Sequence, residues 1–228
     1  MISARSLAIP IFCALLSAHL SYAQDHSTYR EFQFGLNLPA IAKLADLSPS
    51  EAKVLHQRPA LIQELTWQPP SSLRSFPQAD PVWNTIFSFY NGELYRIVVH
   101  YKRNRTAGLT PEDLVEVISA MCGTPTTPST EIAFSLSEVY NDSQVAITRW
   151  EDSQYSFSLF RSSYLPAFGM IGFSKRLDAL AQAATIEAVR MDKQEAPQRE
   201  IERQENRDEE RRASQEKARL VNNPGFRP

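Results

Sequence analysis

The chain has 228 residues, a formal net charge of -2 and two cysteines. A chain this close to neutral has no electrostatic basis for binding nucleic acid or an anionic membrane surface. Because Cys13 lies in the N-terminal apolar segment, Cys122 stands alone in the rest of the chain. This excludes an internal disulfide framework, so a hydrophobic core must stabilise the fold.

The first 23 residues have the pattern of an export signal. Arg5 precedes a mostly apolar stretch from Leu7 to Leu20, and Ser21-Tyr22-Ala23 is a small-x-small cleavage site. The apolar stretch is short for a bilayer span, and no lipobox surrounds Cys13. We therefore predict cleavage after Ala23, export to the periplasm or the medium, and no stable membrane anchor afterwards. An uncleaved anchor is the alternative.

Residues 24–105 are expected to form a first α/β module. The stretch Tyr29 to Phe34 predicts a short strand. Asn37 and Ser48 are suitable N-caps for two successive helices, and the second helix should stop before Pro59.

The clearest local signal is the segment from Ile86 to Tyr101, where two β-rich runs flank Asn91-Gly92. This dipeptide favours a two-residue type I′ turn, and we predict a β-hairpin. An alternating run from Leu61 to Trp67 predicts another strand, and the Pro-rich stretch 68–81 predicts a loop. Both sides of the hairpin are apolar. It is therefore covered on both faces, or has a bulge that shifts its register, or offers one face to a partner.

Residues 106–196 are expected to form a second module. Thr110 is the predicted N-cap of a helix that ends at Gly123. Lys175 to Ala196 predicts a helix with one apolar face that docks on a sheet. Between the two helices, four β-prone runs separated by short turns favour an antiparallel meander. These runs are Glu131 to Val139, Gln144 to Trp150, Gln154 to Arg161 and Ala167 to Phe173.

Residues 197–228 form a charged tail. Between Gln198 and Arg219 the sequence has seven acidic and seven basic residues and almost no apolar stripe. This composition excludes a leucine-type coiled coil. It fits either an exposed helix stabilised by ion pairs three or four residues apart, or a disordered segment.

The predicted fold class is α+β. We expect an antiparallel sheet with short helices packed on one face, as one unit or as two tandem modules, followed by a long charged C-terminal helix. The segments Leu47 to Glu51 and Leu109 to Asp113 are alike, which fits a duplication. The same pattern is also a common helix start, so both interpretations stay open.

A set of short motifs links the chain to a known group of proteins. Gly108-Leu109-Thr110 opens a helix that ends in Gly123-Thr124-Pro125, and the hairpin has a Phe-x-Phe-x-x-Gly-x-Leu pattern from Phe87 to Leu94. With these motifs, the segment from Gly35 to Phe173 resembles the small exported α/β modules of the β-lactamase-inhibitory-protein and outer-membrane small-lipoprotein type. As a whole, the chain resembles a bacterial secreted protein.

This resemblance implies short helices on one antiparallel sheet, tandem copies, protein–protein binding and no catalysis. The chain departs from the group because it lacks the lipobox and the disulfides and adds a charged C-terminal helix.

The sequence contains no phosphate-binding glycine motif and no nucleophile-elbow motif. The histidines after the signal, His26, His56 and His100, are not paired at metal-ligand spacing. Cys122 follows an apolar helical pattern, which favours a buried small hydrophobic side chain over a catalytic thiol. We therefore predict no catalytic, cofactor-binding or metal-binding residues.

Aromatic residues are frequent in the predicted strands and either build the core or form a binding surface. The candidate interaction surface consists of Trp150 and Tyr155, which flank a turn, together with Tyr95 and Tyr101 of the hairpin.

The function that we expect is a non-enzymatic exported protein-interaction module, whose partner is another protein. A carrier of a small apolar ligand between helices and sheet is the first alternative. A hydrolase without a recognisable motif is the second.

Overall fold

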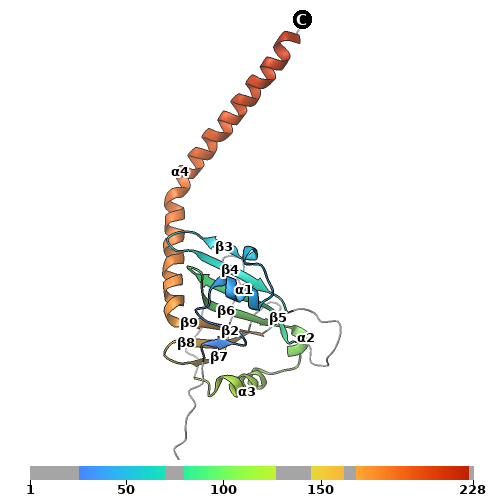
Figure 1. The fold of residues 1–228 in the computed structure, drawn as a ribbon, viewed down its shortest axis with the longest axis vertical. Helices are drawn as coiled ribbons and strands as arrows, with labels where there is room; N and C mark the ends of the chain where they lie inside the picture. The colour runs from blue at the N-terminus through green and yellow to red at the C-terminus, as the bar shows by residue number, and fades with distance from the viewer. Residues whose placement is uncertain (1–25, 70–79, 127–144, 162–167, 226–228) are drawn as a thin grey trace, which may run out of the picture.

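A computed structural model describes residues 26–69, 80–126, 145–161 and 168–225 of the chain. The predicted export signal and the strand expected at 131–139 lie outside these ranges. The fold is α+β, as predicted, and is built on a seven-stranded antiparallel sheet (Figure 1). The strand order is β3-β4-β5-β6-β9-β8-β7.

The first described residues form a small hairpin instead of the single strand that was expected. It consists of β1 (Thr28–Tyr29) and β2 (Phe32–Gln33), and Arg30 in its turn has a φ of 54°. The helix α1 (Leu38–Leu44) follows, and the side chain of its predicted N-cap, Asn37, accepts a hydrogen bond from a first-turn N–H.

The prediction of a second helix, beginning at Ser48, is wrong. Ser48 and Glu51 do form the expected capping box, but the helix is a single 3₁₀ turn, η1 (Pro49–Glu51). The chain then enters β3 (Lys53–His56), which pairs with β4 (Ile62–Trp67). The predicted capping box is present, but the pairing of β3 with β4 overrides the helical tendency of the residues that follow Glu51.

The central hairpin matches the prediction. It joins β5 (Val82–Tyr90) to β6 (Glu93–Tyr101). Asn91 and Gly92 have φ angles of 49° and 85°, which are the left-handed values that a type I′ turn requires.

A β-bulge next to this turn explains why both sides of the hairpin are apolar. Phe89 pairs with Leu94, whereas the preceding Ser88 pairs with Arg96, so Tyr95 is an extra residue in β6. The bulge lets Leu94 and Ile97 face the same side of the sheet. Two of the three alternatives for the apolar hairpin therefore hold together: it has a bulge that shifts its register, and side chains on both of its faces are buried.

The second half of the chain begins with two helices. The short α2 (Arg103–Thr106) was not predicted and contains two basic residues, Arg103 and Arg105. The helix α3 (Pro111–Cys122) starts at Thr110 with a capping box and ends at Gly123, as predicted.

Three strands follow as an antiparallel meander, namely β7 (Val145–Glu151), β8 (Tyr155–Arg161) and β9 (Phe168–Ser174). The last of them pairs with β6 of the first half. Strands from residues 24–105 and 106–196 thus form a single sheet.

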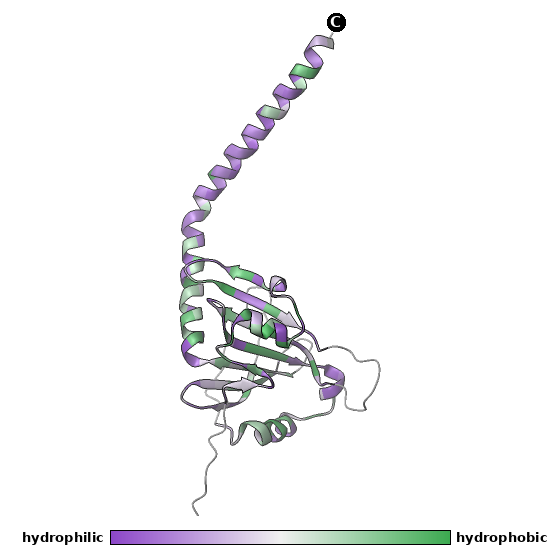
Figure 2. Cartoon of the chain, viewed as in Figure 1, coloured by the Kyte–Doolittle hydropathy of each residue, from purple (hydrophilic) through white to green (hydrophobic). Residues whose placement is uncertain are grey.

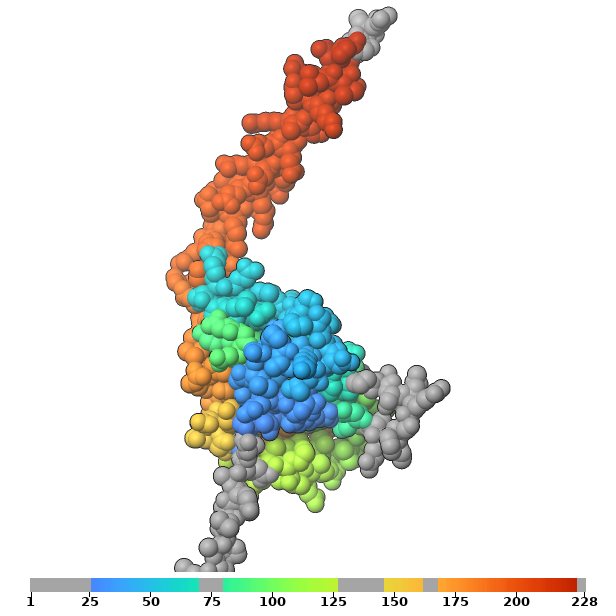
Figure 3. Space-filling model, in the orientation of Figure 1, coloured from blue at the N-terminus to red at the C-terminus, as the bar shows by residue number. Residues whose placement is uncertain are grey.

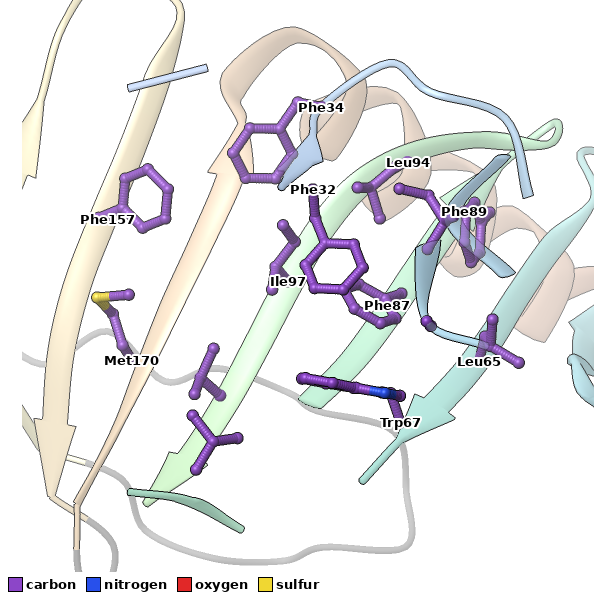
Figure 4. Packing of buried hydrophobic residues seen from close by; sticks show 14 of the residues in the cluster. Phe32, Phe34, Leu65, Trp67, Phe87, Phe89, Leu94, Ile97, Phe157 and Met170 are labelled. Carbon is purple, nitrogen blue, oxygen red and sulfur yellow. The ribbon is translucent and has the colours of Figure 1, made fainter. Parts of the chain in front are cut away.

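Most of the core lies between one face of the sheet and a cover formed by β2, α1 and α3 (Figure 4). The sheet side consists of alternate strand residues: Leu65, Trp67, Phe87, Phe89, Leu94, Ile97, Val99, Trp150, Phe157, Leu159 and Met170. The cover contributes Phe32, Phe34, Leu38, Ile41, Ala42, Leu114 and Ile118. This side is closed by large apolar side chains from elements far apart in the sequence.

Two glycines of β9 let aromatic rings lie flat against the sheet. Gly172 pairs with Phe157 and Gly169 with Phe160. A Cβ atom at Gly172 would lie 2.2 Å from the Phe157 ring, and one at Gly169 would lie 2.3 Å from the Phe160 ring. Because the glycines are three positions apart, the two rings occupy opposite faces of the sheet.

The long helix α4 (Lys175–Asn222) starts directly after β9 and packs on the face opposite to α1 and α3. On that face Ile62, three residues before Leu65, contacts Leu177 and Ala181 of the helix. The charged tail is therefore helical and continues the docking helix without interruption (Figure 1).

Candidate functional site

The C-terminal half of α4 is the main surface that the fold leaves open. We call residues 198–222 the arm. It projects from the body (Figure 3). All its residues except the half-buried Arg199 are exposed. At 1.5 Å per residue, the arm is about 37 Å long. Its surface is mainly hydrophilic, with the exposed apolar residues Ile201, Leu220 and Val221 scattered along it, whereas the part of α4 on the body is mixed (Figure 2).

The docked part of α4 has a narrow apolar face. One leucine, Leu177, and three alanines, Ala181, Ala184 and Ala188, are buried against the body. Alanine buries little area, so hydrophobic contact alone fixes this helix weakly.

A buried ion pair adds to this docking. Nε and Nη2 of Arg96 on β6 donate to Oδ1 of Asp178 at 2.9 and 2.5 Å. Gln182, one turn along the helix, donates to the other carboxylate oxygen at 2.6 Å. The guanidinium also lies 5.3 Å from the ring centre of Tyr95. These contacts hold the first two turns of α4 in one register on the sheet.

The same buried region has an acidic side chain without an ion pair of its own. Burial raises the pKa of Glu64, and the positive charge of Arg96 offsets only part of this effect. Burial likewise raises the pKa of Tyr95. Burial under α4 therefore favours the neutral forms of Glu64 and Tyr95, which lie near the ion pair of Arg96 and Asp178.

Two further ion pairs lie where the helix leaves the body. Arg58, in the connection from β3 to β4, donates to Glu195 at 2.8 Å. Arg199 donates to the backbone carbonyl oxygen of Asp192 at 2.9 Å and to its carboxylate at 3.0 Å. These two contacts flank Pro197, which lacks the N–H that would continue the helical ladder. They connect the body, the docked helix and the first turn of the arm.

Within the arm, ion pairs between neighbouring turns replace tertiary contacts. Glu200 contacts Arg203 and Arg207 at 3.3 and 3.1 Å, and the spacings of three and seven residues place both arginines one and two turns along the same helix face. Similar pairs, Asp208 with Arg211 and Glu216 with Arg219, follow along the arm. The arm is thus a helix supported mainly by its own side chains.

A cleft of about 210 Å³ lies between the end of β3 and α4. Its walls come from two segments. The body supplies Leu55, His56, Gln57 and Arg58, and the helix supplies Ala188, Met191, Asp192 and Arg199. Polar groups predominate, and the cleft spans the junction between body and arm.

The predicted interaction residues lie mostly inside the molecule. Trp150 is fully buried, and its indole N–H is directed to the Ser119 hydroxyl and the Gly123 carbonyl oxygen. Tyr95 is 5% exposed, beneath α4. The aromatic-surface interpretation fails for these two residues because their rings fill the spaces between sheet and helices.

The other two predicted residues are half-buried. Tyr155 stacks on Phe34 with ring centres 5.5 Å apart. Tyr101 packs at the edge of the main core, and burial raises the pKa of its hydroxyl above the ordinary tyrosine value. The four aromatics therefore do not form one exposed patch.

His26 connects three distant segments. Nδ1 lies 3.2 Å from a carboxylate oxygen of Asp152, and Nε2 lies 3.1 Å from the backbone carbonyl oxygen of Cys122. Burial would raise the pKa of Asp152, but backbone N–H groups and His26 together lower it. Burial raises the pKa of the Cys122 thiol. This cluster fastens the start of the chain to the body, and a raised thiol pKa opposes nucleophilic chemistry.

Within the described ranges, no group of three or more His, Cys, Asp or Glu side chains is arranged to hold a metal ion. None of the helices there combines the length and apolar content that a bilayer span requires. Comparisons with protein-family models, curated proteins and solved structures find no match to this chain.

The sequence reasoning missed the junction between body and arm. A signal was present in Arg96, a charge in the middle of the mainly apolar β6, and in Asp178 on the docking face of the helix. Charged residues at core-facing positions are seldom buried without a partner, so this pair was open to prediction. No local signal marks the contact of Arg58 with Glu195, which depends on the tertiary fold.

Proposed function

We propose that this protein is an exported, non-enzymatic protein-interaction module whose body presents the arm to another protein. One observation carries the proposal: the arm is a helix whose residues are all exposed except the half-buried Arg199, yet it is continuous with a helix fixed to the sheet. In the isolated chain, the arm buries no apolar face that would account for its presence. A projecting helix of this kind offers a partner a long surface at a defined place.

The resemblance to β-lactamase-inhibitory-protein-type modules supports the same class of function. A carrier role is less well supported, because in the described ranges the sheet faces are filled by side chains and the cleft has mainly polar walls. The export signal, on which the location in the periplasm or medium depends, is a sequence prediction.

The test is site-specific photocrosslinking in cells that export the protein. A photoreactive amino acid at Ile201 or Ala213 of the arm is compared with one at Val117 of α3, a similarly exposed position on the body. We expect one discrete crosslinked protein from the arm positions and none from Val117.

Equal crosslinking at the arm and body positions, or no adduct at either arm position, would contradict the proposal. The second control is an affinity pull-down with the intact chain and with a chain that lacks residues 198–228. If the shortened chain recovers the same partner with unchanged yield, the contact does not depend on the arm.

A further inference from the structure

We propose that the cleft between β3 and α4 is a binding site for a small oxyanion, a carboxylate or phosphate group, held between Arg58 and Arg199. The two guanidiniums line the same cleft from different parts of the chain. Arg58 belongs to the body, and Arg199 is in the first turn of the arm. An oxyanion between them would contact both parts.

Both guanidiniums have donors to spare. Arginine has five N–H donors in a planar fork. Through Nη2 alone, Arg58 contacts Glu195 and Arg199 contacts Asp192. Among the described residues, no partner is seen for Nε or Nη1 of either side chain. The Nε and Nη1 groups of both arginines can therefore donate hydrogen bonds to an oxyanion without breaking the existing ion pairs.

His56 adds a third donor to the same walls. It lines the cleft and is half-buried. Within the described part of the chain, its imidazole makes no hydrogen bond or ion pair. A half-buried polar ring without a partner gains a hydrogen bond when a ligand oxygen enters the cleft.

The size and charge of the site define the ligand. A volume of about 210 Å³ admits a small molecule but not a folded domain. The carboxylates of Asp192 and Glu195 already neutralise part of the positive charge of the two arginines. We therefore expect a modest affinity for the oxyanion, with a Kd on the order of 1 mM. The walls contain few apolar side chains, which makes a large hydrophobic ligand unsuitable.

The experiment is an NMR titration of the ¹⁵N-labelled full chain with inorganic phosphate and, separately, with acetate at constant ionic strength. The Nε–H resonances of Arg58 and Arg199 are followed, and Arg211 is the matched control. Arg211 is also an exposed guanidinium paired with a carboxylate, Asp208 at 3.0 Å, but it lies far along the arm. We expect saturable shifts at Arg58 and Arg199 and none at Arg211.

Comparison of the two anions shows whether phosphate or carboxylate is preferred. The variants Arg58→Gln and Arg199→Gln should each weaken binding at least about five-fold, whereas Arg211→Gln should leave it unchanged. Shifts that rise linearly at all three arginines would indicate only screening by salt and would overturn the proposal. Unchanged affinity in both cleft variants would overturn it as well. Since these side chains are exposed, dispersed spectra of the variants serve as the check on folding.

Discussion

The ion pair between Arg96 and Asp178 is expected to contribute strongly to the docking of α4. Replacing Asp178 with Leu removes the acceptor of three hydrogen bonds, two from Arg96 and one from Gln182. It also leaves the guanidinium of Arg96, 13% exposed, without a counter-ion. Loss of one partner from a buried pair costs about 3–5 kcal/mol. We expect about 3 kcal/mol for each of the single variants Asp178→Leu and Arg96→Met, because both side chains keep some access to water.

The double variant separates the interaction energy between Arg96 and Asp178 from the contributions that each side chain makes with its other neighbours. With both charges absent, no buried ion is left uncompensated, and replacement of a buried pair by apolar residues is often neutral or stabilising. We expect Arg96→Met with Asp178→Leu to lose about 1–2 kcal/mol, far less than the sum of the single changes. Urea unfolding, followed by tryptophan fluorescence, to which the buried Trp67 and Trp150 contribute, measures the free energies of unfolding of the parent and the three variants.

Two results would refute this reasoning. One is a single variant that loses less than about 1 kcal/mol. The other is a double variant whose loss equals the sum of the single losses to within about 0.5 kcal/mol, because independent sites add in this way. The first result would mean that the pair contributes little to the docking of α4, and the second that Arg96 and Asp178 act independently of each other.

Three further predictions concern the core, the pH dependence and the arm. Gly172→Ala should cost about 1–3 kcal/mol in urea unfolding, because the new methyl group overlaps the Phe157 ring, and an unchanged midpoint would contradict this packing. The bidentate hydrogen bonds from Arg30 lower the pKa of Asp80. The stability from this pair is therefore present above the unfolded pKa and is lost as the pH falls through the folded pKa. Measured by urea unfolding, the difference in stability between the parent and Asp80→Asn should shrink between about pH 5 and pH 2, and a constant difference would refute this. Deletion of residues 198–228 should shift the Tm by no more than about 2 °C while lowering the helical circular dichroism signal, and a larger fall in Tm would show that the arm packs on the body.

Local signals in the sequence predicted much of the fold. The Asn91-Gly92 turn, the N-caps of α1 and α3, and the meander of β7, β8 and β9 all depend on chemistry within a few residues, and all are present. The prediction of a helix after Ser48 is wrong for the opposite reason. Its start signal is local, but the residues after it are drawn into the sheet by β4, a contact that periodicity does not encode.

The candidate site was less predictable than the fold. Trp150 is predicted at the surface because it flanks a turn, and Tyr95 because it is an aromatic residue of the hairpin. Both are buried, since the direction of each ring depends on which elements cover the sheet. The covering helices and the bulge at Tyr95 decide this, and both are tertiary features. The continuity of α4 through Pro197 was also hidden, because a proline usually ends a helical pattern.

The central claim, that the body holds the arm as a helix at a defined place, is tested most directly by a distance distribution between spin labels. In the chain that begins at Gln24, which lacks Cys13, and with Cys122 replaced by Ser, labels at Val117 on the body and Leu220 near the end of the arm both occupy exposed positions. Double electron–electron resonance on this chain should give one narrow distance distribution. A broad distribution, or one that collapses to short distances as the arm folds back on the body, would contradict the account.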